Sequence, residues 1–165
     1  MSRESREQLT NDLFEEWRVL GVANDIADQA VADYLGINRT DARCLDIIER
    51  LGGVSAGRLA RESGLSTGAV TTVLDRLERA GYARRVPDPG DRRRVLVEIT
   101  PATRQANEEL YAPLVEAASE QLSRYSDEEL ELLRDYHRAS RAVTEAHAAR
   151  VRERLQAGRE GEAAS

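Results

Sequence analysis

The ten residues Asp91-Arg92-Arg93-Arg94-Val95-Leu96-Val97-Glu98-Ile99-Thr100 indicate more about the fold of this 165-residue chain than any other stretch. They follow Pro87-Asp88-Pro89-Gly90, a run of residue types that favour tight turns. Apolar and polar residues alternate after the arginines, which predicts a strand, and residues 82–86 predict a second strand before the turn. The two strands form a hairpin whose tip carries three consecutive arginines.

Two short helices joined by a turn are predicted immediately upstream of this hairpin. They span residues 56–62 and 67–80, a serine precedes each as its N-cap, and Ser63-Gly64-Leu65 separates them. A helix pair followed by a basic hairpin is typical of proteins that hold DNA, with one helix in the major groove and the hairpin at the backbone or in the minor groove. An ordinary solvated hairpin is the alternative, because most charge runs are only solvated faces.

The helix over residues 67–80 divides into an apolar and a polar face. Its apolar residues, together with Leu59 and Leu65, can fill a common core. The opposite face supplies the candidate groove contacts, which are Thr67, Gly68, Thr71, Thr72 and Arg76. Small hydroxyl side chains at the N-terminal end of a helix allow close approach to a groove, and the backbone amides there favour phosphate. A plain helical hairpin with a polar face is the alternative.

The charge distribution supports a single basic surface. The whole chain has a net charge of −6. Residues 58–94 contain nine arginines and five acidic residues, a net charge of +4, so the remainder of the chain sums to −10. An acidic body with one basic face suits a protein that presents one surface to DNA.

Long helices are predicted on both sides of the basic segment. The first covers about residues 5–34, opens with the capping box Ser5-x-x-Gln8 and is expected to kink or break at Gly21. A shorter helix is predicted over residues 39–51, with Asn38 or Thr40 as its candidate cap.

After the hairpin, Thr100-Pro101 predicts a helix start, and Pro113 is expected to bend that helix. The last helix opens at the capping box Ser126-x-x-Glu129. The sequence thus predicts a mainly α fold with a small β-hairpin wing. Residues 38–100 form a winged helix-turn-helix domain, residues 1–37 and 101–158 a helical dimerisation region, and residues 159–165 a disordered tail.

The sequence carries no sign of a membrane protein, a metal site or an enzyme. No apolar run is long enough to cross a bilayer, and Met1-Ser2-Arg3-Glu4 lacks the apolar core of a signal peptide, so we expect a cytoplasmic protein. Cys44 is the only cysteine, which excludes a disulfide framework and a Cys-based zinc site. His137 and His147 do not have a metal-chelating spacing. No nucleophile–base set or cofactor fingerprint is present, so we predict neither an enzyme nor a cofactor.

One combined pattern resembles a known family. Its residues are Leu65-Ser66, Val70-Thr71, Asp75-Arg76-Leu77-Glu78, Gly81, Arg85, Pro87 and Asp91-x-Arg93-x-x-x-Val97-x-Ile99-Thr100. This pattern resembles the MarR family of bacterial transcription regulators over about residues 37–100, whereas the flanking helices resemble it in placement and length only. The resemblance implies a homodimer with a winged helix-turn-helix in each subunit, which binds double-stranded DNA.

The resemblance also implies roles for single residues. It makes Arg93 the wing-tip contact in the minor groove, Asp91 its orienting partner and Arg92 a second phosphate contact. Many family members carry a basic residue at the position of Thr72, so base readout there is weaker or different in this chain. Pro113 is a second departure from the family pattern.

A small effector, often aromatic or lipophilic, is a further implication of the resemblance. It would bind where the dimerisation helices meet the DNA-binding lobe, and the candidate pocket residues are Trp17, Leu20, Cys44 and Tyr111. The alternative is that each of these residues belongs to the core or the dimer interface. Cys44 is also a candidate peroxide sensor, with a buried inert thiol as the alternative.

We therefore predict a homodimeric, sequence-specific DNA-binding transcriptional regulator. It would act as a repressor that leaves a pseudo-palindromic operator when a ligand favours a spacing of the two reading heads that does not fit the DNA. A ligand-blind architectural DNA-binding protein and a cysteine-based redox-sensing regulator are the alternatives.

Overall fold

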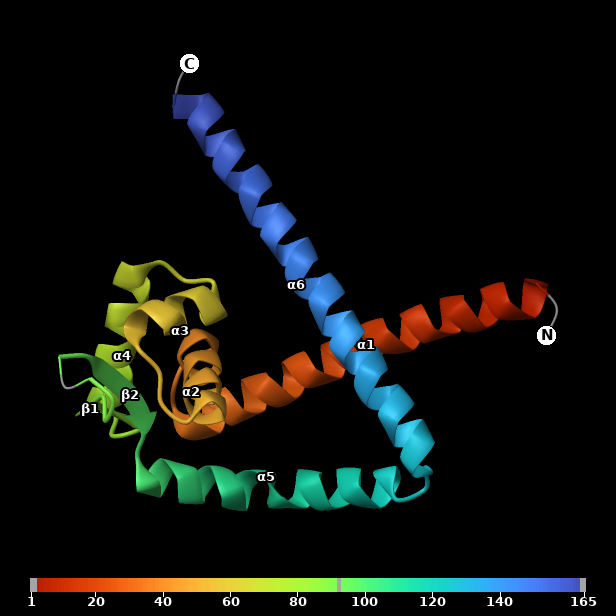
Figure 1. Ribbon diagram of the computed structural model, residues 1–165, viewed down its shortest axis with the longest axis horizontal. Coiled ribbons are helices and arrows are strands. Elements are labelled where there is room, and N and C mark those ends of the chain that lie inside the picture. The colour runs from red at the N-terminus through yellow and green to blue at the C-terminus, as the bar shows by residue number, and fades with distance from the viewer. Residues whose placement is uncertain (1–2, 92, 164–165) are drawn as a thin grey trace. The chain divides into compact units, whose positions relative to one another are not determined.

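The helices and strands follow the order that the sequence predicts. The computed structural model in Figure 1 describes residues 3–91 and 93–163. Its elements are α1 (Arg3–Leu35), α2 (Arg39–Leu51), α3 (Ala56–Ser63), α4 (Thr67–Arg79), β1 (Ala83–Pro87), β2 (Val95–Ile99), α5 (Pro101–Leu122) and α6 (Asp127–Ala163). The chain divides into two compact units, Met1–Leu110 and Tyr111–Ser165, with the boundary inside α5.

The core of the first unit lies among α2, α3, α4 and the hairpin. Leu74 and Leu77 of α4 are buried together with Ile48 of α2, Leu59 of α3 and Val97 of β2. The apolar positions of α4 are three and four residues apart, so they form one stripe that can be removed from water as a unit. This arrangement confirms the mainly helical fold with a helix-turn-helix core.

Three helices begin at N-caps predicted from the sequence, and α2 uses Asn38, since the other candidate, Thr40, lies inside the helix. Asn38, Ser55 and Ser66 each accept a hydrogen bond from the backbone N–H three residues later, at 2.9, 3.4 and 3.3 Å. These bonds matter because the N–H groups of a first helical turn have no partner inside the helix. At its other end α4 stops at Arg79, and Gly81, with a φ of 77°, turns the chain towards β1.

The hairpin grows directly out of the core. β1 and β2 are antiparallel, and Arg85 lies opposite Val97. On the other edge of β2, Val97 exchanges two backbone hydrogen bonds with Val54, at 2.8 and 3.0 Å. Val97 and Ile99 are both buried, as the alternation in this strand predicts. The base of the wing is therefore held on both edges of β2.

Side-chain hydrogen bonds also attach α1 and α5 to this body. The hydroxyl of Tyr82 donates to the carbonyl oxygen of Leu35, in the last residue of α1, at 2.6 Å. The buried Asn107 of α5 donates to a carboxylate oxygen of Glu49 in α2 at 2.7 Å. The end of α1 and the start of α5 are thereby fixed to the helix-turn-helix.

The first helix differs from its prediction at two points. α1 is one uninterrupted helix of 33 residues, so the break expected at Gly21 does not occur. A single glycine costs a helix only about 1 kcal/mol relative to alanine, which is too little to interrupt it. The start expected at Ser5 is also wrong, because α1 already begins at Arg3.

The second unit consists of the remainder of α5 and of α6. Pro113 lies inside α5 and does not end it. The predicted capping box is confirmed, because Glu129 N–H donates to Ser126 Oγ at 3.3 Å and Ser126 N–H donates to Glu129 Oε2 at 2.9 Å. α6 continues to Ala163 and so enters the segment 159–165 for which disorder was expected. That segment contains no proline, and most of its residues are good helix formers.

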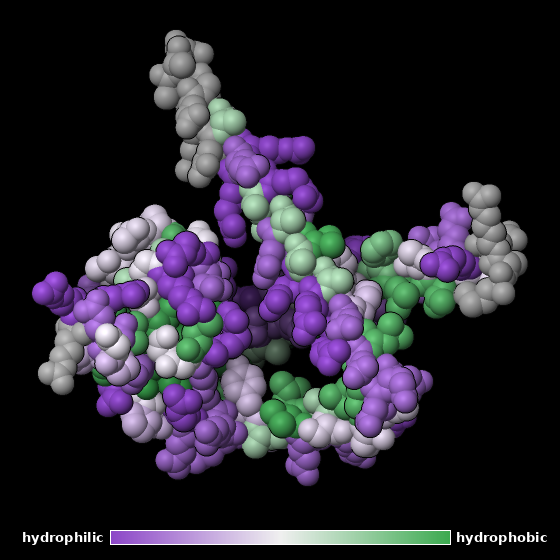
Figure 2. All heavy atoms as spheres, in the orientation of Figure 1, coloured by the Kyte–Doolittle hydropathy of each residue, from purple (hydrophilic) through white to green (hydrophobic). Residues whose placement is uncertain are grey.

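Large apolar side chains are exposed on α1 and, separately, on α5 and α6. Those more than two-fifths exposed include Leu9, Leu13, Phe14, Trp17, Leu20 and Ile26 on α1, and Leu114, Val115, Leu132, Tyr136, Val143 and Leu155 on α5 and α6. Figure 2 shows hydrophobic side chains at the surface of these helices. Even so, none of the helices within residues 3–91 and 93–163 is long and apolar enough to span a membrane.

Candidate nucleic-acid interface

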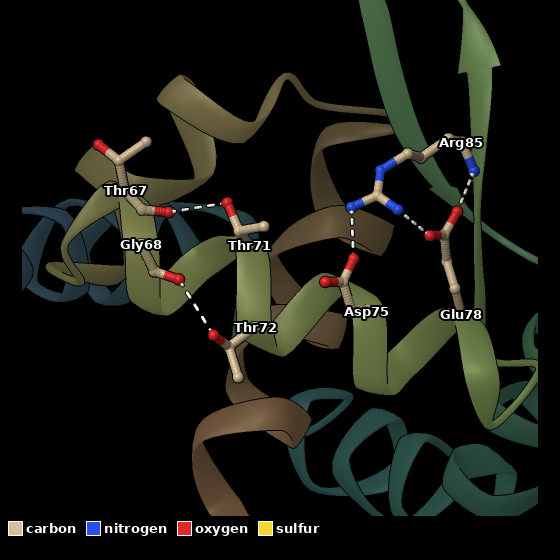
Figure 3. Close-up of polar contacts among 7 residues, drawn as sticks. All are labelled: Thr67, Gly68, Thr71, Thr72, Asp75, Glu78 and Arg85. Atoms are coloured by element: carbon tan, nitrogen blue, oxygen red, sulfur yellow. Dashed lines mark hydrogen bonds and ion pairs between the residues drawn. The ribbon is translucent and has the colours of Figure 1, made fainter.

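The N-terminal half of α4 presents small side chains to solvent. Thr67, Gly68, Thr71 and Thr72, four of the five predicted groove residues, are all exposed. The hydroxyl of Thr71 donates to the carbonyl oxygen of Thr67 at 3.1 Å, and that of Thr72 to the carbonyl oxygen of Gly68 at 3.2 Å (Figure 3). The hydroxyl protons are thus used within the helix, while the oxygen lone pairs and methyl groups stay available. Such groups can accept hydrogen bonds from base amino groups or pack on a thymine methyl.

The start of α4 also provides a site for an anion. Ser66 caps one N–H of the first turn, and the other N–H groups there have no partner within the helix. Their partial positive charge favours a phosphate at this end. Gly68 keeps the approach open, because no atom other than those of its chain neighbours and of the backbone of its own helix lies within 4 Å of the point where a Cβ would stand.

Arg76, the fifth predicted groove residue, forms an ion pair with Asp41 of α2. Its Nε donates to Asp41 Oδ2 at 2.8 Å and a terminal nitrogen donates to Oδ1 at 2.5 Å. Asp41 is buried in α2, and the Asn38 side chain donates to the same carboxylate at 3.0 Å. Hydrogen bonding to Asp41 raises the pKa of Arg76 above its usual value. The geometry therefore gives Arg76 a part in the packing of α4 on α2, while its side chain stays 40% exposed, and its contact with the groove stays a prediction.

The hairpin tip is shaped by Asp91. Its carboxylate accepts a hydrogen bond from the backbone N–H of Arg93 at 3.1 Å, and its carbonyl oxygen accepts one from the N–H of Arg94 at 2.8 Å. Asp91 thus orients Arg93 through the backbone, and the Arg93 side chain is exposed at the tip. Arg92, the other predicted wing contact, lies outside the described residues.

A network between the hairpin and α4 was not anticipated from the sequence. Arg85 of β1 forms ion pairs with Asp75 and Glu78 of α4 (Figure 3). The available signal was two acidic residues three apart on a helix, followed by an arginine in the next strand. Charge patterning of this kind does not distinguish a network from a solvated helix face.

The four candidate pocket residues lie in different surroundings within their own units. Cys44 is fully buried in the helix-turn-helix core, beside residues of α3 and α4. Trp17 and Leu20 are exposed on α1, and Tyr111 belongs to the second unit. Cys44 is therefore a core residue of the DNA-binding domain. Within residues 3–91 and 93–163, no three His, Cys, Asp or Glu side chains are grouped in a way that could hold a metal ion.

We expect the thiol of Cys44 to react slowly in the native protein. Burial raises the pKa of Cys44, and only the thiolate is a strong nucleophile, so little reactive thiolate is present at neutral pH. A colorimetric thiol reagent should label the native protein far more slowly than protein unfolded in urea. Rapid labelling of native protein, together with loss of DNA binding after peroxide treatment, would contradict this assignment and favour redox sensing.

Comparisons with known proteins agree with the geometry. The family described as "MarR family" matches residues 35–94. The chain is 40% identical over 132 residues to the uncharacterized HTH-type transcriptional regulator YcgE of Bacillus subtilis. The aligned residues cover 80% of this chain and 86% of that protein. It is also 34% identical over 99 residues to the multiple antibiotic resistance protein MarR of Salmonella typhimurium. Here the aligned residues cover 56% of this chain and 69% of that protein.

A solved structure shows the same fold. It is a single-substitution mutant of S. aureus MepR bound to an oligodeoxyribonucleotide, with a TM-score of 0.53 at 19% identity over 74% of this chain and 90% of that chain. YcgE is named as a transcriptional regulator and the second relative is MarR itself, which confirms the prediction that the chain is not an enzyme. On the strength of these relatives and of the winged helix-turn-helix, the chain belongs to the MarR family of transcriptional regulators.

Proposed function

We propose that this chain is a homodimer that binds operator DNA sequence-specifically, with α4 in the major groove and the hairpin tip in the minor groove. The proposal rests on the observation that α4 and the hairpin belong to one packed core. The exposed start of α4 and the exposed Arg93 extend from one core, to which Leu74 and Val97 both belong. The DNA-bound state of the MepR mutant with this fold supports the same use of the fold here.

The two parts of the surface serve different purposes. Thr71 and Thr72 are short enough for α4 to approach base edges closely, so they suit sequence readout. Arg93 carries a permanent charge to the tip of the wing, where a narrow minor groove attracts arginine. The phosphate and minor-groove contacts supply affinity, and the major-groove contacts supply selectivity.

The proposal of a homodimer rests on the exposed apolar faces of α1, α5 and α6. Leu13, Trp17 and Leu20 of α1 are each close to half exposed, and Val143 and Leu155 of α6 are at least three-fifths exposed. Exposed apolar helix faces of this kind mark interaction sites, and two copies of one chain can bury them symmetrically. We expect light scattering at micromolar concentration to give twice the chain mass of 18.4 kDa. A mass of one chain would contradict the dimer.

The operator is expected to be a pseudo-palindrome with half-site centres about 10 bp apart, or a multiple of that, because a two-fold dimer presents two equivalent reading helices. The experiment is selection of duplexes from a random pool by the full-length protein, followed by footprinting of the selected sequence and of a scrambled duplex. Protection of a single half-site would contradict the symmetric arrangement. Equal protection of both duplexes would instead favour the architectural alternative.

We further propose that a small aromatic or lipophilic ligand releases this regulator from its operator, so that it acts as a repressor. Apolar surface near Trp17 and Leu20 of α1 supports such a ligand, whereas the burial of Cys44 speaks against release by oxidation. The ligand can shift the equilibrium only if it binds the DNA-free conformation more tightly than the DNA-bound one. A thermal-shift screen with phenolic acids, followed by operator-binding assays with each hit, tests this step.

A further inference from the structure

Arg85 joins the hairpin to α4 through three contacts. One terminal nitrogen of its guanidinium lies 2.9 Å from Asp75 Oδ1, and the other contacts Glu78 Oε2. The backbone N–H of Arg85 donates to the second oxygen of Glu78 at 3.0 Å. Figure 3 shows the guanidinium between the two carboxylates, with the strand on one side and the helix on the other. Glu78 therefore holds both the main chain and the side chain of one hairpin residue.

These contacts occur where the hairpin leaves the core. Arg85 lies opposite Val97, which is buried and hydrogen-bonded to Val54. β1 ends two residues later at Pro87, and the tip with Arg93 follows. The ion pairs at Arg85 thus link the base of the hairpin to α4.

The two carboxylates continue the face of α4 that carries the exposed threonines. Residues three, four and seven apart share one face of a helix, so Thr71, Asp75 and Glu78 lie in one row. Asp75 is exposed and Glu78 is half-buried. In the proposed complex this row lies beside the DNA backbone, where uncompensated carboxylates repel phosphates. The positive charge of Arg85 offsets one of the two negative charges and lies close to both.

We propose that Arg85 is a positioning residue of the DNA-binding surface, which directs the hairpin relative to α4 and offsets the charges of Asp75 and Glu78 without contacting DNA itself. This inference rests on the proposed function. Under this proposal, the contribution of Arg85 to DNA binding depends on the presence of Asp75 and Glu78. A direct phosphate contact, by contrast, would not depend on those partners.

The test is whether the effect of removing Arg85 disappears when its partners are removed. Four full-length proteins are compared, namely the wild type, Arg85→Gln, Asp75→Asn/Glu78→Gln and the combination of all three substitutions. Their affinities for a fluorescent duplex selected by the wild type from a random pool are measured at several salt concentrations. Arg84→Gln is the matched control, because it removes the same charge from the neighbouring position of β1, where the partner is Glu98 at 3.4 Å. Thermal unfolding establishes that each variant is folded.

We expect Arg85→Gln to weaken binding roughly tenfold in the wild-type background and less than about twofold in the Asp75→Asn/Glu78→Gln background, because coupled residues act non-additively. Arg84→Gln should have a smaller effect than Arg85→Gln. An equal loss in both backgrounds, with a salt dependence reduced by about one counterion, would reveal a direct contact and overturn the proposal. The absence of a loss in either background would overturn it as well. Failure of the proposed function is read separately, because the wild type would then select no sequence from the pool.

Discussion

Replacing Leu74 with alanine is expected to lower the free energy of unfolding by about 2–5 kcal/mol, the usual cost of truncating a leucine in a packed core. Leu74 is only 1% exposed and lies on the face of α4 that packs against the rest of the helix-turn-helix core. The smaller side chain loses its own burial and leaves a cavity that the surrounding residues fill only in part. Urea denaturation followed by circular dichroism measures the loss, with all proteins at one concentration because the stability of a dimer depends on concentration.

Thr72→Ala is the matched control for this measurement. Thr72 is exposed on the same helix, and its hydroxyl donates to the carbonyl oxygen of Gly68 in the preceding turn. Its substitution should therefore change the free energy of unfolding by less than about 0.5 kcal/mol. Equal losses at the two positions would mean that α4 does not bury the face described above.

Arg93→Ala is expected to weaken operator binding by about 1–3 kcal/mol, the usual effect of removing one arginine contact to DNA. It should also reduce the slope of log affinity against log salt concentration by about 0.9, because one fewer phosphate charge is neutralised. Arg93 is exposed at the hairpin tip and its backbone is held by Asp91, so the fold should not change. Fluorescence anisotropy titrations at several salt concentrations measure both quantities.

Thr71→Ala separates readout from charge in the same assay. A threonine hydroxyl displaces no counterion, so this substitution should lower affinity for the operator while leaving the salt dependence unchanged. If Arg93→Ala altered neither the affinity nor the slope, the wing would be an ordinary solvated hairpin and the proposed contact would be lost.

The helix starts and the strand alternation of this fold could be predicted from the sequence, because each depends on residues only a few positions apart. The caps at Asn38, Ser55 and Ser66 each act on an N–H three residues away. The strand alternation that buries Val97 and Ile99 likewise needs only neighbouring residues. The prediction of a break at Gly21 was wrong, because a glycine weakens a helix locally but does not decide whether the helix ends there.

By itself the sequence determined the helix-turn-helix and the basic hairpin from residue types at short spacings, and its resemblance to the MarR family is confirmed by the family match over residues 35–94 and by the sequence relatives. Tertiary structure alone decided which arginines are paired with carboxylates of the protein itself. Arg76 is engaged by a carboxylate 35 residues away, and Arg85 by two carboxylates on a different element, whereas Arg93 is exposed at the tip. The physical reason is that an ion pair depends on distances of a few ångströms between side chains, and packing sets those distances between residues far apart in the chain.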